Sequence, residues 1–339
     1  MSAAWVARLP TSRPDDVSAL AEIPGELVGR VQAVVGKTEG NGCVNDFSRA
    51  LAARAWHDAF AQPVVTCMSG GTEGVLSPHV TLLGTQDDDP GAPPGGLAIG
   101  TAVSTVIRPH ELGRRPQVDA VAATVTAACH AAGFEPSAAE FVLVKCPLLT
   151  SDDIAVSAGP LVTADTYASM GHSRAASALG AALATGEVND DGVASALDGN
   201  GTVWSSVAST SSGVEVGACH VVVLGPSASV RSRLRASHAV MTDAIDAAPV
   251  QTLLNEVKSA GGRLIQLFAK AEASPDGAVR GRRHTMLTDS DINATRHARA
   301  AVGGLLAGLS GETAIYVSGG AEHQGPPGGG PVTVVWELP

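Results

Sequence analysis

The chain has 339 residues and a net charge of −11, with 45% hydrophobic and 16% charged residues. This composition supplies apolar surface for a large core. The negative charge and the low aromatic content of 3% argue against a nucleic-acid partner. Gly, Pro or a charge interrupts every apolar run before the roughly 18 residues that a membrane span needs, and the five cysteines contain no C-x-x-C pair. We therefore expect a globular cytoplasmic protein with free thiols that contacts neither nucleic acid nor membrane.

The first chemically distinctive segment is a short apolar run that ends in a lysine. Residues 34–37 read Val-Val-Gly-Lys, a β-branched pattern typical of a buried strand. Arg49 follows Lys37 in the sequence, and Ser69 opens the string Ser-Gly-Gly-Thr-Glu, in which Gly70 is the second residue. A lysine at the tip of a buried strand is poorly solvated, so we expect burial to lower its pKa.

The second segment repeats the same order of residues. The run 141–145, Phe-Val-Leu-Val-Lys, predicts a buried strand that ends in Lys145. Arg174 follows at a longer interval than in the first segment, at the start of an alanine-rich stretch that predicts a helix. Ser211 then opens the string Ser-Ser-Gly-Val-Glu, with Ser212 in place of the first glycine.

The third segment has the spacing of the second. Lys270 ends the run 267–270, and Arg299 follows it at the same interval as in the second segment, before another alanine-rich stretch. Ser318 opens the string Ser-Gly-Gly-Ala-Glu, which includes Gly319. Three copies of Lys, Arg and Ser in one order predict three homologous α/β units. We place these units at residues 1–104, 112–249 and 250–339, with the basic segment 108–115 as a linker.

These residue types suggest acyl-transfer chemistry. Serine is a weak nucleophile, and a desolvated lysine can act as its base. The small residues after each serine allow backbone N–H groups to approach an oxygen, and arginine offers a rigid fork of donors. If the three sets surround a pseudo-threefold axis, they form a pocket for a small ring with several C=O and N–H groups. The repeats alone could equally be structural.

Other motifs do not fit. Gly36-Lys37-Thr38 is not a phosphate-binding loop, because the first glycine of that motif would fall on Val31. The chain contains no H-E-x-x-H, and its ten histidines show no zinc-ligand spacing.

The strings that carry the repeat also resemble the ring-opening amidohydrolase family, which comprises cyanuric acid hydrolases and barbiturases. The resemblance covers nearly the whole chain and rests on residues 36–42, 68–79, 144–150, 269–277, 284–287 and 318–326. It implies an α/β fold of three homologous units around a pseudo-threefold axis, with a central β-barrel, helices outside and the active site on the axis.

The implied reaction is hydrolysis of a ring amide of cyanuric acid to carboxybiuret, which loses CO2 to become biuret. The alternative within the family is barbiturase, which converts barbiturate to ureidomalonate. An alternative from another class is a non-catalytic binder of cyclic imides.

The resemblance also implies roles for individual residues. The middle pair, Ser211 and Lys145, is expected to supply nucleophile and base. Because the strand before Lys145 is the most continuously apolar of the three, we expect its pKa to be the lowest. The expected substrate-binding residues are Arg49, Ser69, Gly70, Arg174, Ser211, Ser212, Arg299, Ser318, Gly319, Lys37 and Lys270.

Finally, the resemblance implies a structural metal, usually Mg²⁺, and a homotetramer. No catalytic cofactor is expected. Oxygen-only ligands suit such a hard cation. They would be the Glu272 side chain and backbone oxygens near Ala321, Gln324, Pro326 and Gly329.

Overall fold

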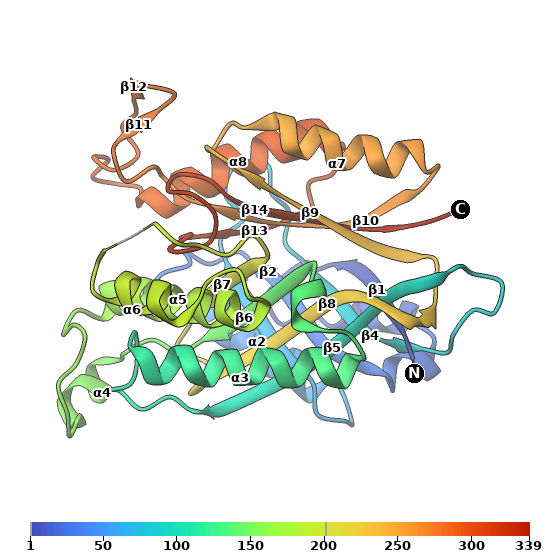
Figure 1. Ribbon diagram of the computed structural model, residues 1–339, viewed down its shortest axis with the longest axis horizontal. Coiled ribbons are helices and arrows are strands. Elements are labelled where there is room, and N and C mark those ends of the chain that lie inside the picture. The colour runs from blue at the N-terminus through green and yellow to red at the C-terminus, as the bar shows by residue number, and fades with distance from the viewer. Residues whose placement is uncertain (1, 201) are drawn as a thin grey trace.

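The structure is a computed structural model that describes residues 2–200 and 202–339, and it contains three four-stranded sheets (Figure 1). Within each sheet, the strands numbered by chain order lie side by side as first, fourth, second, third. The fourth strand is antiparallel to both neighbours, whereas the second and third strands are parallel. Three stretches of the chain therefore have the same topology, and the predicted α/β class is confirmed.

The elements follow one another in three sets. The first set comprises β1 (Ala3–Pro10), the short helices η1 (Ser18–Glu22) and α1 (Gly25–Val28), β2 (Val31–Thr38), α2 (Phe47–Asp58), β3 (Val65–Gly70) and β4 (His79–Gln86). The second comprises β5 (Pro94–Val106), α3 (Arg115–Ala132), η2 (Pro136–Ala138), β6 (Phe141–Cys146), α4 (Ser151–Val156), α5 (Thr166–Thr185), α6 (Asp190–Leu197), β7 (Ala208–Ser212) and β8 (Ala218–Arg231). The third comprises β9 (Leu234–Met241), α7 (Ala247–Ser259), β10 (Arg263–Ala271), the hairpin β11 (Ala278–Val279) and β12 (Arg282–Arg283), α8 (Ala294–Ser310), β13 (Tyr316–Gly319) and β14 (Gly330–Glu337).

The long helices cover the outer faces of the sheets, and the inner faces share one core. α2 contacts the first sheet, α3 and α5 contact the second, and α7 and α8 contact the third; Figure 1 shows α7 and α8 together over one side of the molecule. The shared core draws apolar side chains from all three sheets. At its centre the rings of Phe141 and Phe268 stack with centroids 4.5 Å apart, and Tyr316 lies 5.6 Å from Phe268.

The expected closed barrel is not found among the described residues, because the strands form three separate sheets. Strands β3, β7 and β13 are edge strands, and lysine side chains of a neighbouring sheet reach the backbone of two of them. Lys145 Nζ on β6 donates to Met68 O on β3 at 2.7 Å. Lys270 Nζ on β10 donates to Thr210 O on β7 at 2.8 Å. These buried side-chain bonds connect adjacent sheets near the axis.

The sheet boundaries differ from the predicted unit boundaries. β5 lies mostly within predicted unit 1–104 but pairs with β8 of the second sheet. β9 lies within predicted unit 112–249 but pairs with β14 of the third sheet. The polar segment 108–115 consequently lies inside the second set, between β5 and α3, rather than between units. Composition does not reveal such pairing, because it depends on strands that are distant in the sequence.

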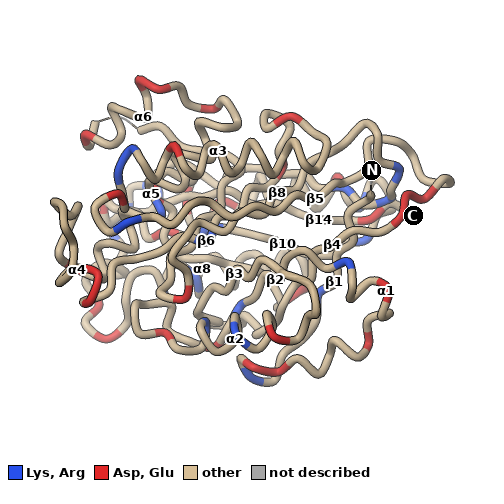
Figure 2. Tube along the Cα trace, turned by 90° about the horizontal axis from the view of Figure 1, so that it is seen from below, with Lys and Arg blue, Asp and Glu red and all other residues tan. Residues whose placement is uncertain are grey.

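The charged residues are dispersed over the part of the chain that the structure describes. Figure 2 shows Asp and Glu on many peripheral loops, with Lys and Arg scattered among them rather than gathered along one face. Among the described residues, no helix has both the length and the apolar character required to cross a membrane.

Candidate active site

The three lysine–serine pairs lie on adjacent parallel strands in the same register. Lys37 is the β-partner of Ser69, Lys145 of Ser211, and Lys270 of Ser318. Partners in register project their side chains from the same face of a sheet. All six residues are buried, and each of the three lysines is only 1% exposed. The sheet topology therefore converts the sequence repeat into three side-by-side Ser-Lys pairs.

The three predicted arginines come from helices that begin with a capping side chain. Asp46, Asp165 and Asn293 accept backbone N–H bonds at the first turns of α2, α5 and α8, respectively. Capped starts of this kind stabilise the helix. Arg49 lies in the first turn of α2, whereas α5 and α8 begin several residues before Arg174 and Arg299, which the sequence placed at helix starts. The alanine-rich part of these two helices can be recognised as helical from the sequence, whereas their polar first turns cannot.

Each arginine lies near the glutamate of another unit's serine string. Arg299 donates to Glu73 at 2.6 and 2.7 Å, and Arg174 donates to Glu322 at 2.5 and 2.8 Å. Arg49 Nε lies 3.8 Å from Glu215. The pairing is cyclic: the third unit's arginine meets the first unit's glutamate, the first meets the second's, and the second meets the third's. Such cyclic contacts are the signature of a pseudo-threefold arrangement.

One small pocket lies where the three sets meet. Its lining includes every predicted serine and arginine of the three sets and the small residues after the serines. The residues concerned are Arg49, Ser69, Gly70, Arg174, Ser211, Ser212, Arg299, Ser318 and Gly319. Gly42 and Met170 complete the lining, and the predicted lysines lie behind it, in contact with the serine strands. The structure thus brings the predicted binding residues together around one cavity.

The three Ser-Lys pairs are not equivalent. Lys37 Nζ donates to Ser69 Oγ at 3.3 Å, and Lys270 Nζ donates to Ser318 Oγ at 3.1 Å. Among the described residues, Lys145 makes no hydrogen bond to Ser211; its Nζ contacts Met68 O and forms a 2.8 Å ion pair with Glu215. The Ser211 hydroxyl therefore faces the pocket without a protein hydrogen bond from the described residues.

The pKa values of the three lysines depend on burial and on the charged groups next to each lysine. Burial lowers the pKa of Lys37 and Lys270 well below that of a solvated lysine, and Arg299 and Arg174, respectively, lower them further. Burial also lowers the pKa of Lys145, but the Glu215 carboxylate opposes this effect. The expectation that Lys145 has the lowest pKa is not supported, because Lys145 has a carboxylate in direct contact that opposes the effect of burial.

The glycine shared by the three serine strings has a steric reason. A Cβ on Gly71 would lie 2.5 Å from Arg299, and one on Gly320 would lie 2.6 Å from Arg174. A Cβ on Gly213 would lie 2.1 Å from the Glu215 carboxylate. Each glycine thus leaves room for a charged group of the site, whatever its backbone N–H contributes to substrate binding.

The predicted metal ligands gather beside the loop that follows β13. Gly328 N–H donates to Glu272 Oε2 at 2.9 Å. The carbonyls of Ala321 and Pro326 accept bonds from Gln324 N and Gly329 N. Burial raises the pKa of Glu272, and no described residue forms a salt bridge with it. The Gln324 side chain is not free to bind an ion, because its Oε1 accepts from Thr210 N at 2.6 Å.

The described residues contain no group of three or more His, Cys, Asp or Glu side chains positioned to hold a metal. A cation in this loop would therefore be held by one carboxylate and backbone oxygens. This donor set is compatible with a hard ion that accepts carbonyl ligands.

Comparison with known proteins identifies the family. A family model described as "amidohydrolase ring-opening protein" matches residues 5–337. The chain belongs to this family.

Individual members of the ring-opening amidohydrolase family match over the full length. A cyanuric acid amidohydrolase of Pseudonocardia dioxanivorans is 54% identical over 345 residues, which cover 100% of this chain and 99% of that protein. A Rhodococcus cyanuric acid amidohydrolase is 51% identical, covering 100% of this chain and 97% of the relative.

Solved structures of the family agree with the fold. One cyanuric acid hydrolase superposes with a TM-score of 0.94 at 43% identity and covers 100% of both chains. The cyanuric acid hydrolase from A. caulinodans gives a TM-score of 0.90 at 45% identity, covering 100% of this chain and 99% of that one. The expected family membership is confirmed.

Sequence reasoning missed a layer of side chains beneath the pocket. Cys67, Ser209 and Tyr316 each lie two residues before a pocket serine, on the same face of their strands. Ser209 Oγ and Tyr316 Oη are buried without a hydrogen-bond partner among the described residues. The period of two in a strand places these positions next to the serines, but their three unlike side chains hide the equivalence.

Proposed function

We propose that this protein is a cyanuric acid amidohydrolase, which opens the s-triazine ring to carboxybiuret; this product then loses CO2 to become biuret. The observation that carries the proposal is the pocket, in which three Ser-Lys-Arg sets from three like units surround one small cavity. Cyanuric acid is threefold symmetric, so the same donors and acceptors meet each of its carbonyl and N–H groups. The names and full-length similarity of the relatives support this substrate.

In the proposed reaction, Ser211 Oγ attacks a ring carbonyl carbon and Lys145 accepts the hydroxyl proton. Ser211 supports this role because its hydroxyl lines the pocket and is not engaged by a lysine, unlike Ser69 and Ser318. The carbonyl oxygen becomes an oxyanion, which backbone N–H groups stabilise. The C–N bond of the ring then breaks and Lys145 returns the proton to the leaving nitrogen. Water hydrolyses the acyl-enzyme.

The other two sets bind the ring. Arginine remains protonated and cannot act as a base, so Arg49, Arg174 and Arg299 hold carbonyl oxygens. Ser69 and Ser318, whose hydroxyls accept from lysines, orient the remaining edges of the ring.

A structural Mg²⁺, or another hard divalent cation, is part of the proposal. Glu272 supports it, since a buried carboxylate without a salt bridge among the described residues is costly unless a cation neutralises it. Glu272 and the carbonyls of the loop at Ala321–Gly329 would hold the ion, which would stabilise that loop. No step of the reaction requires it.

Two further expectations remain predictions. The family resemblance implies a homotetramer. The five cysteines are all free thiols, which fits a reducing compartment, and we propose the cytoplasm.

The first experiment incubates the purified protein with cyanuric acid or with barbituric acid and follows biuret and ureidomalonate. Biuret formation supports the proposal. Turnover of barbituric acid alone would identify a barbiturase, and binding of both compounds without turnover would identify a cyclic-imide binder.

The second experiment tests the assigned roles. Ser211→Ala and Lys145→Ala should each lower kcat by several powers of ten, with the double variant little worse, because nucleophile and base act as a unit. An acyl-enzyme trapped for mass spectrometry should carry its label on Ser211. A label on Ser69 or Ser318 would overturn the assignment and leave the substrate unchanged.

A further inference from the structure

The glutamate four residues after each pocket serine has a different partner in the second unit. Glu73 pairs with Arg299, and Glu322 pairs with Arg174, at 2.5 to 2.8 Å. Glu215 is instead 2.8 Å from Lys145 Nζ and 3.8 Å from Arg49 Nε. Only in this unit, among the described residues, does the glutamate form its close ion pair with the lysine of the Ser-Lys pair.

The two terminal nitrogens of Arg49 bind backbone carbonyls, and its Nε stays 3.8 Å from Glu215, beyond hydrogen-bond distance. Its Nη2 donates to Cys43 O at 2.6 Å, and its Nη1 donates to Ser212 O at 3.0 Å. The side chains of Glu215 and Lys145 are 5% and 1% exposed, so water contributes little to either charge. A buried charge needs a partner, and for each of these two groups the other is the nearest.

We propose that Glu215 is a positioning residue, which holds Lys145 in the pocket wall and controls when this lysine releases its proton to become the base for Ser211. The inference rests on the proposed function, in which Lys145 is that base. It makes the second Ser-Lys pair chemically distinct from the other two, although the three share one strand geometry.

The groups around Lys145 determine the direction of the effect. Burial, followed by the positive charge of Arg49, lowers the pKa of Lys145, whereas Glu215 raises it; the Cys146 thiol raises it more weakly. Cys67 on β3 and His220, the β8 partner of Lys145, also face the pair. Burial raises the pKa of Cys67 to about 12 and lowers that of His220, so both remain neutral near pH 7. Removing the Glu215 charge must therefore lower the pKa of Lys145.

The kinetic test compares kcat/KM against pH for the wild type and Glu215→Gln. A base must be neutral to act, so activity falls as pH drops through the Lys145 pKa. An opposite charge at this distance commonly moves a pKa by about 1 to 3, so the acidic limb should move to lower pH by about one unit or more. A purely structural role would lower the plateau and leave the limb in place, and that result would overturn the inference.

Glu73→Gln is the matched control. It removes the corresponding glutamate of the first unit, whose partners are Arg299 and Arg296. We expect KM to rise because Arg299 loses its anchor, with the acidic limb unmoved. A limb that shifts equally in both variants would contradict a specific link between Glu215 and Lys145.

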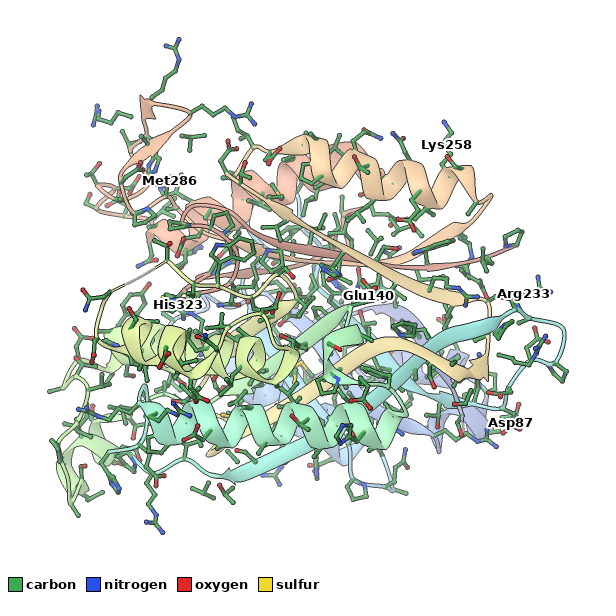
Figure 3. All side chains as sticks on the ribbon, in the orientation of Figure 1. Asp87, Glu140, Arg233, Lys258, Met286 and His323 are labelled. Carbon is green, nitrogen blue, oxygen red and sulfur yellow. The ribbon has the colours of Figure 1, made fainter. Side chains whose placement is uncertain are left out.

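The order in which the lysines titrate can be measured in the wild type, without any glutamate variant. The chain has only four lysines, at positions 37, 145, 258 and 270, so ¹³Cε-lysine labelling gives four NMR signals, assigned by single Lys→Arg variants. Lys258 projects from the outer side of α7 (Figure 3) and serves as the solvated reference. In the wild type, Lys145 should titrate at higher pH than Lys37 and Lys270, and Glu215→Gln should move only its signal substantially.

The outcomes separate the two proposals. If Lys145 titrates with or below Lys37 and Lys270 while the protein hydrolyses cyanuric acid, the role of Glu215 is wrong and the function stands. If the lysines titrate in the expected order but no cyclic imide is hydrolysed, the function is wrong.

Discussion

Comparing Gly320→Ala with Gly311→Ala tests how strongly activity depends on the position of Arg174, separately from the effect of backbone strain on stability. Gly320 has φ +79°, and a Cβ built on it would lie 2.6 Å from the Arg174 guanidinium. Gly311, at the C-cap of α8, has nearly the same φ of +76°, with open space around a Cβ. The two substitutions impose the same backbone strain, but only one of them also displaces a pocket residue.

The expected magnitudes follow from this comparison. A non-glycine residue in the left-handed region costs about 1–2 kcal/mol, so both variants should lose at least that amount of unfolding free energy. In Gly320→Ala, the guanidinium must also retreat by about 1 Å to reach ordinary van der Waals distance. That movement disturbs its bonds to Glu322 at 2.5 and 2.8 Å. A misplacement of about 1 Å can cost roughly 10²-fold in rate, so kcat/KM should fall by about 10- to 100-fold.

The assay combines urea unfolding with steady-state hydrolysis of cyanuric acid for the wild type and both variants. A loss of kcat/KM in Gly320→Ala alone, with a loss of stability at least as large as in Gly311→Ala because the Arg174–Glu322 pair is also disturbed, would support the assigned position of Arg174. The reasoning is refuted if Gly320→Ala retains kcat/KM within about twofold of Gly311→Ala.

The remaining predictions concern binding, acid stability and the metal. Arg49→Ala, Arg174→Ala and Arg299→Ala should each raise KM and lower kcat/KM about 10- to 100-fold, because a hydrogen bond to a charged group contributes about 1.5–3 kcal/mol; unchanged steady-state kinetics would remove that arginine from the pocket. Burial alone would raise the pKa of Glu73, but Arg299 lowers it below the ordinary 4.5. Its ionised form therefore stabilises the fold above about pH 4.5, and this contribution is lost as pH falls through the lower folded value. Urea midpoints should accordingly fall less steeply below that pH in Glu73→Gln than in the wild type, and identical slopes would contradict the pairing. Chelation should lower the melting temperature, with activity falling only as the fold loosens; complete loss of turnover in a folded, metal-free protein would contradict a structural ion.

Much of the candidate site could be predicted because its residues recur at similar places in homologous units. Lys145 and Lys270 each precede their arginine by the same interval, so the second and third units can be aligned with each other from this sequence alone. The structure then brings each lysine beside its serine, because β6 pairs with β7 and β10 pairs with β13 in parallel. The order of residues along the chain is therefore sufficient to predict a Ser-Lys pair when the strands that carry the lysine and the serine are neighbours in one sheet.

What could not be predicted depends on contacts between units. Glu322 pairs with Arg174, which lies 148 positions away in the sequence. No local sequence pattern predicts a contact between residues so far apart. The expected pKa order of the lysines is not supported for the same reason. Lys145 forms an ion pair with Glu215, while the terminal nitrogens of Arg49 bind backbone carbonyls. The first strand of each later unit was misplaced because its partner is the last strand, at the far end of the unit.

The pocket combines a symmetric binding surface with an asymmetric set of proton carriers. A threefold ring binds best when each edge meets the same donors, and cyclic Glu–Arg contacts hold those donors in all three units. Hydrolysis needs a single nucleophile, and three equally activated serines would offer no further gain in the attack on one carbonyl. The differences fall where protons are held: in the partner of Lys145, in the free Ser211 hydroxyl, and beneath the pocket, where Tyr316 stands in place of a smaller residue. If Glu215 controls the Lys145 proton, the three units share their arginines and serines around the ring and differ mainly in the second unit, where the reaction takes place and Ser212 replaces a glycine of the pocket lining.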